Sequence, residues 1–147
     1  MNRKRNAALL VAYLLVTLVF LLNSIGIVDQ SEAVRELVNR GVPSGIAPGL
    51  MLAGRAVELL GSLGLVFGFY RRFAIAGLIA FLIAATYVGH PFWLLASTPQ
   101  FTPQLINFLK NLAIMGGLFY IASIDSLVSA PGFRAQPISL KQVEHAD

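Results

Sequence analysis

The 147-residue chain contains no cysteine, and this absence removes several classes of chemistry. Disulfide bonds, thiol redox reactions, iron–sulfur clusters and thiolate metal sites all need cysteine side chains. Histidine is almost as scarce, since the chain has only His90 and His145. A haem held by two histidines of this chain is therefore not expected. The sequence predicts no catalytic residue, no metal site and no cofactor bound by the chain itself.

Charged residues are the second scarcity. They make up 12% of the chain, against about 25% in a typical soluble domain. Hydrophobic residues reach 56%, and the mean hydropathy is +0.73. The composition is typical of an integral membrane protein with one domain. The net charge of +4 comes from basic residues near the ends of apolar segments, which suits anionic lipid headgroups rather than nucleic acid.

Long apolar segments fill most of the chain. They predict four transmembrane helices over about residues 7–28, 49–70, 73–89 and 103–124. At 1.5 Å per residue such segments are about 26–33 Å long, which matches the hydrocarbon core of a bilayer. The predicted fold class is therefore all-α, an integral membrane four-helix bundle over residues 1–125. The polar residues 126–147 are predicted to form a flexible cytoplasmic tail.

The first apolar segment has an alternative interpretation as a signal peptide. A basic stretch over residues 1–5 precedes an apolar run from Ala7 to Leu22. That run is slightly longer than the 7–15 residues expected of a signal peptide core, and the small-residue cleavage sites near residues 24–26 and 31–33 match poorly. We therefore predict that the first helix is retained.

The distribution of lysine and arginine predicts the orientation. Seven basic residues fall on one side of the membrane: three within residues 3–5, two at 71–72, and one each at 134 and 141. The other side has Arg35 and Arg40, which nearby acidic residues offset. Basic residues concentrate in cytoplasmic loops. We therefore expect a multi-pass protein of the bacterial cytoplasmic (inner) membrane, with both termini cytoplasmic.

The loop after the first helix carries signals for a helix of its own. Asp29 and Glu32 form a candidate capping box, Gly41 suits a helix C′ position, and Pro43 stops continuation. These signals predict a short amphipathic helix over about residues 30–40 on the outer surface. The simplest role for this helix is to cover the end of the bundle.

The loop before the last helix is rich in proline and aromatic residues. Pro91 is expected to end the third helix and to move His90 out of helical conformation. Thr102 is expected to cap the fourth helix, with Pro103 in its first position. The nearby aromatic side chains suit an outer aromatic belt. An alternative is that they form a lid over a pocket.

Three charged residues lie inside the predicted spans. A charge near the bilayer centre costs about 2.5–3.5 kcal/mol on insertion scales, so such residues pair, face a cavity or bind a ligand. All three fall in the outer half of the predicted bundle, together with nearby polar side chains. We therefore expect a polar pocket that opens outward. The ligand-binding candidates are Arg55, Glu58, His90, Lys110, Asn111 and Asn23.

Two interpretations of these charges remain open. In the first, Glu58 forms a structural ion pair, with Lys110 preferred over Arg55 because a partner on the same helix gives only modest coupling. In the second, the two cations and one anion bind an acidic or carbonyl-bearing ligand. His90 at the rim could then move protons, or it could have only a structural role.

Glycine recurs every seven residues on the second predicted helix, at Gly54, Gly61 and Gly68. Small residues spaced in this way let two membrane helices approach closely. We therefore expect this face to pack against a neighbouring helix.

Several short motifs together resemble the DoxX family. They are VELLG at 57–61 with Gly68 and Arg72, GVP at 41–43, GHPFW at 89–93 and FLKNLAIMGG at 108–117. The resemblance extends over about residues 23–122. It places Glu58, His90, Lys110 and Asn111 at polar positions of the family. One departure is that many members have Gly-x-x-Lys at the outer end of the first helix, whereas residues 23–26 here read NSIG.

The resemblance implies a four-helix membrane protein associated with quinol or thiosulfate oxidation or with oxidative-stress assemblies. We therefore expect a non-catalytic accessory subunit of a redox-linked assembly, with a quinone or another small molecule as candidate ligand. Its expected partners are the lipid bilayer, a redox subunit or further copies of itself. The alternatives are a small transporter or channel subunit acting as an oligomer, and a quinone oxidoreductase subunit.

Overall fold

The computed structural model describes residues 3–27 and 30–129, and within these residues every regular secondary-structure element is a helix. Its elements are α1 (Arg3–Ser24), α2 (Gln30–Asn39), α3 (Ala47–Phe67), α4 (Arg71–Gly89), the short 3-10 helix η1 (Phe92–Leu94) and α5 (Phe101–Ser129). The all-α fold class is confirmed. Three stretches are long and apolar enough to cross a membrane: Ala47–Phe67, Arg71–Leu94 and Phe101–Ile124. The apolar part of α1, Leu9–Ser24, is shorter.

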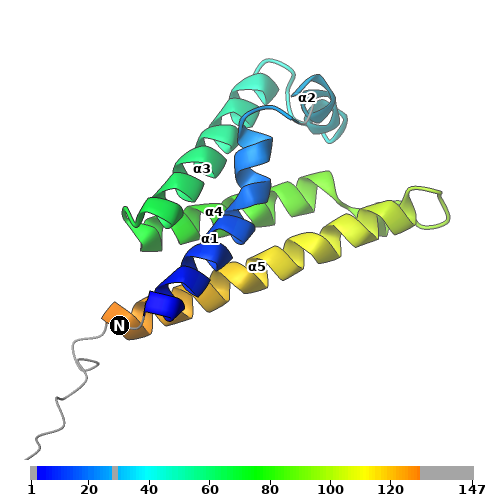
Figure 1. The fold of residues 1–147 in the computed structure, drawn as a ribbon. Coiled ribbons are helices and arrows are strands. Elements are labelled where there is room, and N and C mark those ends of the chain that lie inside the picture. Colours follow the sequence, from blue (N-terminus) through cyan, green and yellow to red (C-terminus); the bar gives the residue numbers. More distant parts are fainter. Residues whose placement is uncertain (1–2, 28–29, 130–147) are drawn as a thin grey trace, which may run out of the picture.

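The long helices form two pairs that diverge from one end of the molecule (Figure 1). Helix α1 packs along α3, and α5 packs along α4. Helices α3 and α4 are joined by a short turn and also pack on each other. Away from that turn the α1–α3 pair separates from the α4–α5 pair, with α2 at the far end of the first pair and η1 at the far end of the second (Figure 1).

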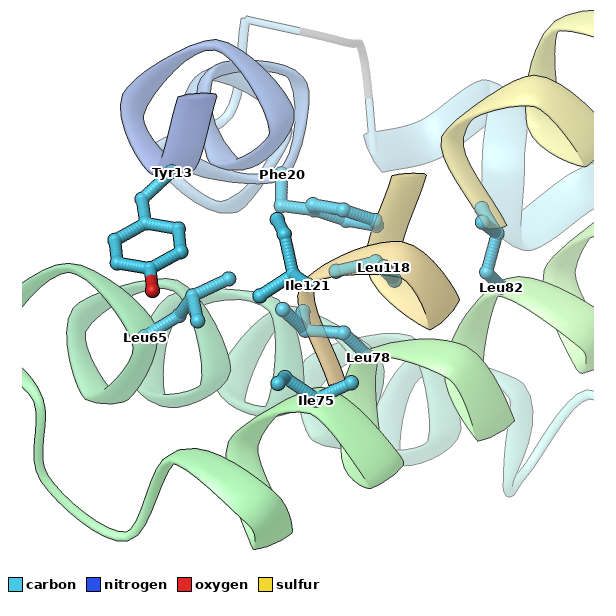
Figure 2. Packing of buried hydrophobic residues seen from close by; sticks show 8 residues of the cluster. All are labelled: Tyr13, Phe20, Leu65, Ile75, Leu78, Leu82, Leu118 and Ile121. Atoms are coloured by element: carbon cyan, nitrogen blue, oxygen red, sulfur yellow. The ribbon is translucent and has the colours of Figure 1, made fainter. Parts of the chain in front are cut away.

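The hydrophobic core lies where the two pairs meet. Figure 2 shows Tyr13 and Phe20 of α1 together with side chains from the other three long helices. These are Leu65 of α3, Ile75, Leu78 and Leu82 of α4, and Leu118 and Ile121 of α5. Each long helix thus contributes to one buried cluster. Many other large apolar side chains remain exposed, such as Leu15 at 66% and Leu60 at 68%, as expected of helices in contact with lipid.

Glycines end the first two helices. Gly26 has a φ of 88°, and the bonds from Gly26 N to Asn23 O and from Ile27 N to Leu22 O form a Schellman motif. Helix α1 therefore ends at Ser24, and the prediction that it continues to residue 28 was wrong. Gly41 has a φ of 90° and closes the same motif after α2, which confirms its predicted C′ position.

Of the other predicted helix ends, some agree with the structure and others do not. Helix α4 ends at Gly89, and His90, the residue before Pro91, has a non-helical conformation, as predicted. Helix α5 begins at Phe101, so Thr102 is a helical residue and the prediction that it caps the helix was wrong. Pro103 is tolerated there because the first-turn amides have no intrahelical partner. Helix α5 also continues to Ser129, five residues beyond the predicted end. Residues 130–147 of the predicted tail, and Asp29 of the predicted capping box, lie outside the described residues.

Glycines bring α3 and α4 together. A Cβ atom added to Gly54 would lie 2.9 Å from the Phe81 ring, and one added to Gly61 would lie 2.7 Å from the Leu78 side chain. Such distances are too short for real contacts, so only glycine permits this approach. The predicted close packing is confirmed at these two positions. Gly68 instead ends α3 in a left-handed conformation, with a φ of 85°.

Candidate functional site

The buried carboxylate of Glu58 is held by a residue from α1. Glu58 lies on α3 and is 3% exposed. The Asn23 amide nitrogen lies 2.7 Å from each carboxylate oxygen and donates to the carboxylate. Asn23 can reach across because it sits in the last turn of α1, immediately before the chain turns at Gly26. Because the two residues come from different helices, this contact fastens α1 to α3.

Two further polar side chains lie next to Glu58 on α3. Arg55, one turn away, acts electrostatically on the Glu58 carboxylate. Its guanidinium also lies close to Gly26, because a Cβ added there would be 3.4 Å from an Arg55 nitrogen. Ser62, one turn in the other direction, is fully buried, and its hydroxyl has no hydrogen-bond partner in the part of the chain that the structure describes. Asn23, Arg55, Glu58 and Ser62 thus form the α1–α3 polar group.

A second polar group joins α4 to α5. The Asn111 amide donates to the Thr86 hydroxyl at 2.9 Å, and Nδ1 of His90 lies 2.7 Å from the amide oxygen of Gln104. Thr86 lies in the last turn of α4 and His90 directly follows that helix, while Gln104 and Asn111 are two turns apart on α5. These two hydrogen bonds fasten α4 to α5 at the end of this helix pair that lies away from the α3–α4 turn. The structure therefore divides the candidate residues between two helix pairs.

Lys110 belongs to neither group. Its side chain is exposed, and it makes no hydrogen bond or ion pair with the residues that the structure describes. The expectation that Lys110 pairs with Glu58 was therefore wrong. The described partners of Glu58 are Asn23 through hydrogen bonds and Arg55 through charge.

The register of the helices explains this separation. The neighbour of Lys110, Asn111, bonds to Thr86 near the end of α4. Glu58 lies between Gly54 and Gly61, which pack against residues 81 and 78 of α4, nearer the start of that helix. A separation of five to eight residues along a helix corresponds to about 8–12 Å. Lys110 and Glu58 therefore lie at different depths as well as on different helix pairs.

Aromatic side chains surround η1. Phe92 contacts Trp93, Phe101 and Phe108 with ring centroids 5.2, 6.0 and 5.1 Å apart, and all three pairs are edge-to-face. Tyr87 of α4 lies 5.7 Å from Trp93. These contacts connect the end of α4 with the start of α5. The aromatic residues thus form a packed cluster at the same end of the molecule as the bond between His90 and Gln104.

An open groove of about 520 Å³ lies between α3 and α4, near the turn that joins them. Tyr70 is the only lining residue with a polar side chain, and the other lining residues are Ala56, Val57, Leu60, Gly61, Leu63, Gly64, Phe69, Phe73, Ala74 and Gly77. This groove is not the polar, outward-opening pocket expected from the sequence. The candidate polar residues Glu58, His90 and Asn111 do not line it. Within the described residues no three His, Asp or Glu side chains come together as a metal site.

The family model for DoxX matches residues 8–91, which is more than half of the chain. The chain belongs to the DoxX family. Comparisons with curated proteins and with solved structures gave no significant match. The DoxX match extends from α1 to the residue after His90, so Asn23, Arg55, Glu58 and His90 lie inside it, whereas Lys110 and Asn111 lie beyond it. Family membership and the three long apolar helices establish a membrane protein with transmembrane helices.

Sequence reasoning overlooked Thr86 in this DoxX protein. Thr86 is 3% exposed and accepts the bond from Asn111. A signal was present, since Thr86 and His90 are four residues apart at the end of the third predicted helix, and Gln104 and Asn111 are seven apart on the next helix. Within each pair the two polar residues are separated by about one or two helical turns, so they lie on one side of their helix. This pattern indicates that the two polar surfaces face each other.

Proposed function

We propose that this DoxX-family chain is a non-catalytic accessory subunit of a redox-linked assembly in the bacterial inner membrane. The observation that carries the proposal is the exposure of Lys110 within an apolar helix. Glu58 is buried and bonded inside the chain, whereas Lys110 has no counter-group among the described residues. A partner subunit that supplies such a group would remove the cost of an unpaired charge in lipid.

The depth of Lys110 supports this proposal. Lys110 is nine residues from the start of α5 at Phe101, or about 14 Å along the helix axis. An unpaired lysine at the bilayer centre costs about 2.5–3.5 kcal/mol, and a lysine closer to the surface reduces this cost by snorkelling.

We further propose that α1 is the fourth transmembrane helix, because its apolar residues 9–24 contribute Tyr13 and Phe20 to the shared core.

The test is to measure the assembly in native membranes with substitutions at Lys110. We expect Lys110→Ala to shift the tagged protein from a larger complex to a smaller species in native electrophoresis. Lys110→Arg keeps the charge and should retain the complex. Lys141→Ala, in the tail, is the matched control for the loss of a lysine. An unchanged complex in Lys110→Ala would refute the proposed role of Lys110.

A quinone is the second candidate for the counter-group of Lys110. Asn111 and His90 were also expected to donate to quinone oxygens. In the structure the Asn111 amide instead donates to Thr86, and Nδ1 of His90 is bonded to Gln104. Lys110 makes no hydrogen bond with a described residue, so its ammonium group is available to donate to a quinone oxygen. Any electron flow would come from a partner that carries the cofactor.

The quinone proposal has a separate test. We expect the isolated chain to show no turnover with quinols and common electron acceptors. If quinone binds at Lys110, a bound quinone analogue should dissociate more easily from Lys110→Ala than from the unmodified protein. Turnover by the purified chain without added cofactor would refute the non-catalytic role. Equal binding by both proteins would remove Lys110 from the quinone proposal.

A further inference from the structure

The groove between α3 and α4 has the shape and position of a site for a hydrocarbon chain. On α3 it extends over residues 56–64, which corresponds to about 12 Å along the helix axis. It begins at the turn between the helices, where Phe69, Tyr70 and Phe73 are all more than two-thirds exposed. Its long direction follows the two helices, so an occupant entering at the turn would lie parallel to them.

The bottom of the groove is shaped by small residues. Gly61 and Gly64 on α3 let Leu78 and Ala74 of α4 come into close contact. The large rings lie at the turn, and the other lining residues are glycine, alanine, valine and leucine. Such a surface has no polar group to orient a polar ligand, apart from the Tyr70 hydroxyl at one end. It favours an apolar chain over a compact polar molecule.

The end of the groove at the turn carries positive charge. Arg72 lies in sequence between the lining residues Tyr70 and Phe73, and its side chain is exposed. Arg71 faces a different neighbour, since its guanidinium carbon lies 5.1 Å from the centre of the Tyr13 ring on α1. An exposed arginine near the membrane surface attracts anionic lipid by about 1 kcal/mol. A ligand with an anionic headgroup and an apolar chain therefore matches both parts of the groove.

We propose that the α3–α4 groove binds one anionic phospholipid, with an acyl chain between the helices and its phosphate near Arg72 and the Tyr70 hydroxyl. This site is separate from the polar groups and from Lys110. It would fill the space beside the α3–α4 hairpin, where glycine leaves little side chain to stabilise the helix contact. The bound lipid would then act as a structural part of the membrane domain.

The experiment is native mass spectrometry of the purified protein titrated with dioleoyl-phosphatidylglycerol in detergent. Gly77→Leu should fill the groove, because a Cβ at Gly77 meets only Val57, at an ordinary 3.7 Å. Loss of about two buried methylene contacts corresponds to about tenfold weaker binding. Ala56→Leu fills the same groove from α3 and should have a similar effect. Gly116→Leu is the control, since nothing lies within 4 Å of a Cβ at Gly116.

The headgroup is tested separately. Arg72→Gln should weaken phosphatidylglycerol binding about fivefold and leave phosphatidylcholine binding unchanged. Thermal melting in detergent identifies any variant that fails to fold, and the second groove variant then decides. Equal lipid binding by the unmodified protein and by a folded groove variant would overturn the site. Equal binding of phosphatidylglycerol and phosphatidylcholine would overturn the proposed preference for an anionic headgroup. Displacement of the lipid by a helix of another protein would show that the groove is a subunit interface.

Discussion

At the scale of single residues, Glu58 and Lys110 show opposite ways of keeping a charge in an apolar helix. Glu58 is buried, and Asn23 of α1 donates to both of its oxygens. Lys110 is exposed and has no described partner. The first arrangement is complete within the chain and is expected to be structural. The second is incomplete, and it is the reason for proposing a partner subunit.

Removing the donor to Glu58 should destabilise the protein. We expect Asn23→Ala to lower the free energy of unfolding by about 1–3 kcal/mol, because it leaves a buried carboxylate without its hydrogen bonds. Thermal melting in detergent measures the effect. Ser62→Ala is the matched control, since it removes a buried hydroxyl that has no described hydrogen bond and should be neutral or stabilising. Equal stability of Asn23→Ala and the unmodified protein would show that the contact is not structural.

At the scale of helices, the packing of α3 on α4 depends on glycine. We expect Gly61→Ala to destabilise the hairpin by about 1–3 kcal/mol, because the new methyl group would lie 2.7 Å from Leu78 and force the helices apart. The control is Gly116→Ala on α5, where a methyl group meets nothing within 4 Å. Alanine also favours helix by about 1 kcal/mol over glycine, so the control should be neutral or more stable. If Gly61→Ala melted at or above the temperature of the control, close packing at Gly61 would not be needed.

Local signals in the sequence predicted several of these features because each depends on near neighbours. Gly41 ends α2, Pro91 ends the α4 region, and Gly54 and Gly61 face α4, all as expected from residue type and spacing. The end of α1 was missed because the apolar run in the sequence continues through Ile25 and Ile27, on both sides of Gly26. Only the backbone geometry at that glycine ends the helix.

The candidate site was predicted less well, because it depends on how helices rotate and slide against each other. The positions of Glu58 and Lys110 within the predicted helices placed both in the same half of the bundle and suggested that they pair. The register of α5 on α4 is instead set by Thr86, whose role was not expected, and this register places Lys110 away from Glu58. Pair contacts between helices need this information, which one sequence does not contain.

At the scale of the whole molecule, apolar and polar side chains separate along the helix axes. The core joins all four long helices near the α3–α4 turn, and the side-chain hydrogen bonds that connect one helix to another lie farther from this turn, where the helix pairs diverge (Figure 1). The basic residues Arg71 and Arg72 lie at the α3–α4 turn. If that turn is cytoplasmic, the polar groups belong to the outer half of the membrane.

The orientation can be tested with reporter fusions. We expect a fusion at residue 147 to be active with a cytoplasmic reporter and inactive with a periplasmic one, because basic residues are retained in the cytoplasm. A fusion within residues 96–100, between η1 and α5, should give the opposite result. A periplasmic C-terminus would contradict the predicted orientation.

The central claim is that the α5 face around Lys110 contacts a partner subunit. The most direct measurement is site-specific photo-crosslinking in native membranes, with the crosslinker at Ile106 or Ala113, one turn to either side of Lys110. Both positions are exposed. Leu15 on α1, which is 66% exposed, is the control for a lipid-facing position. We predict one discrete protein adduct from each α5 position, none from Leu15, and loss of the α5 adducts in Lys110→Ala. Adducts of equal yield from all three positions, or α5 adducts that persist in Lys110→Ala, would contradict the claim.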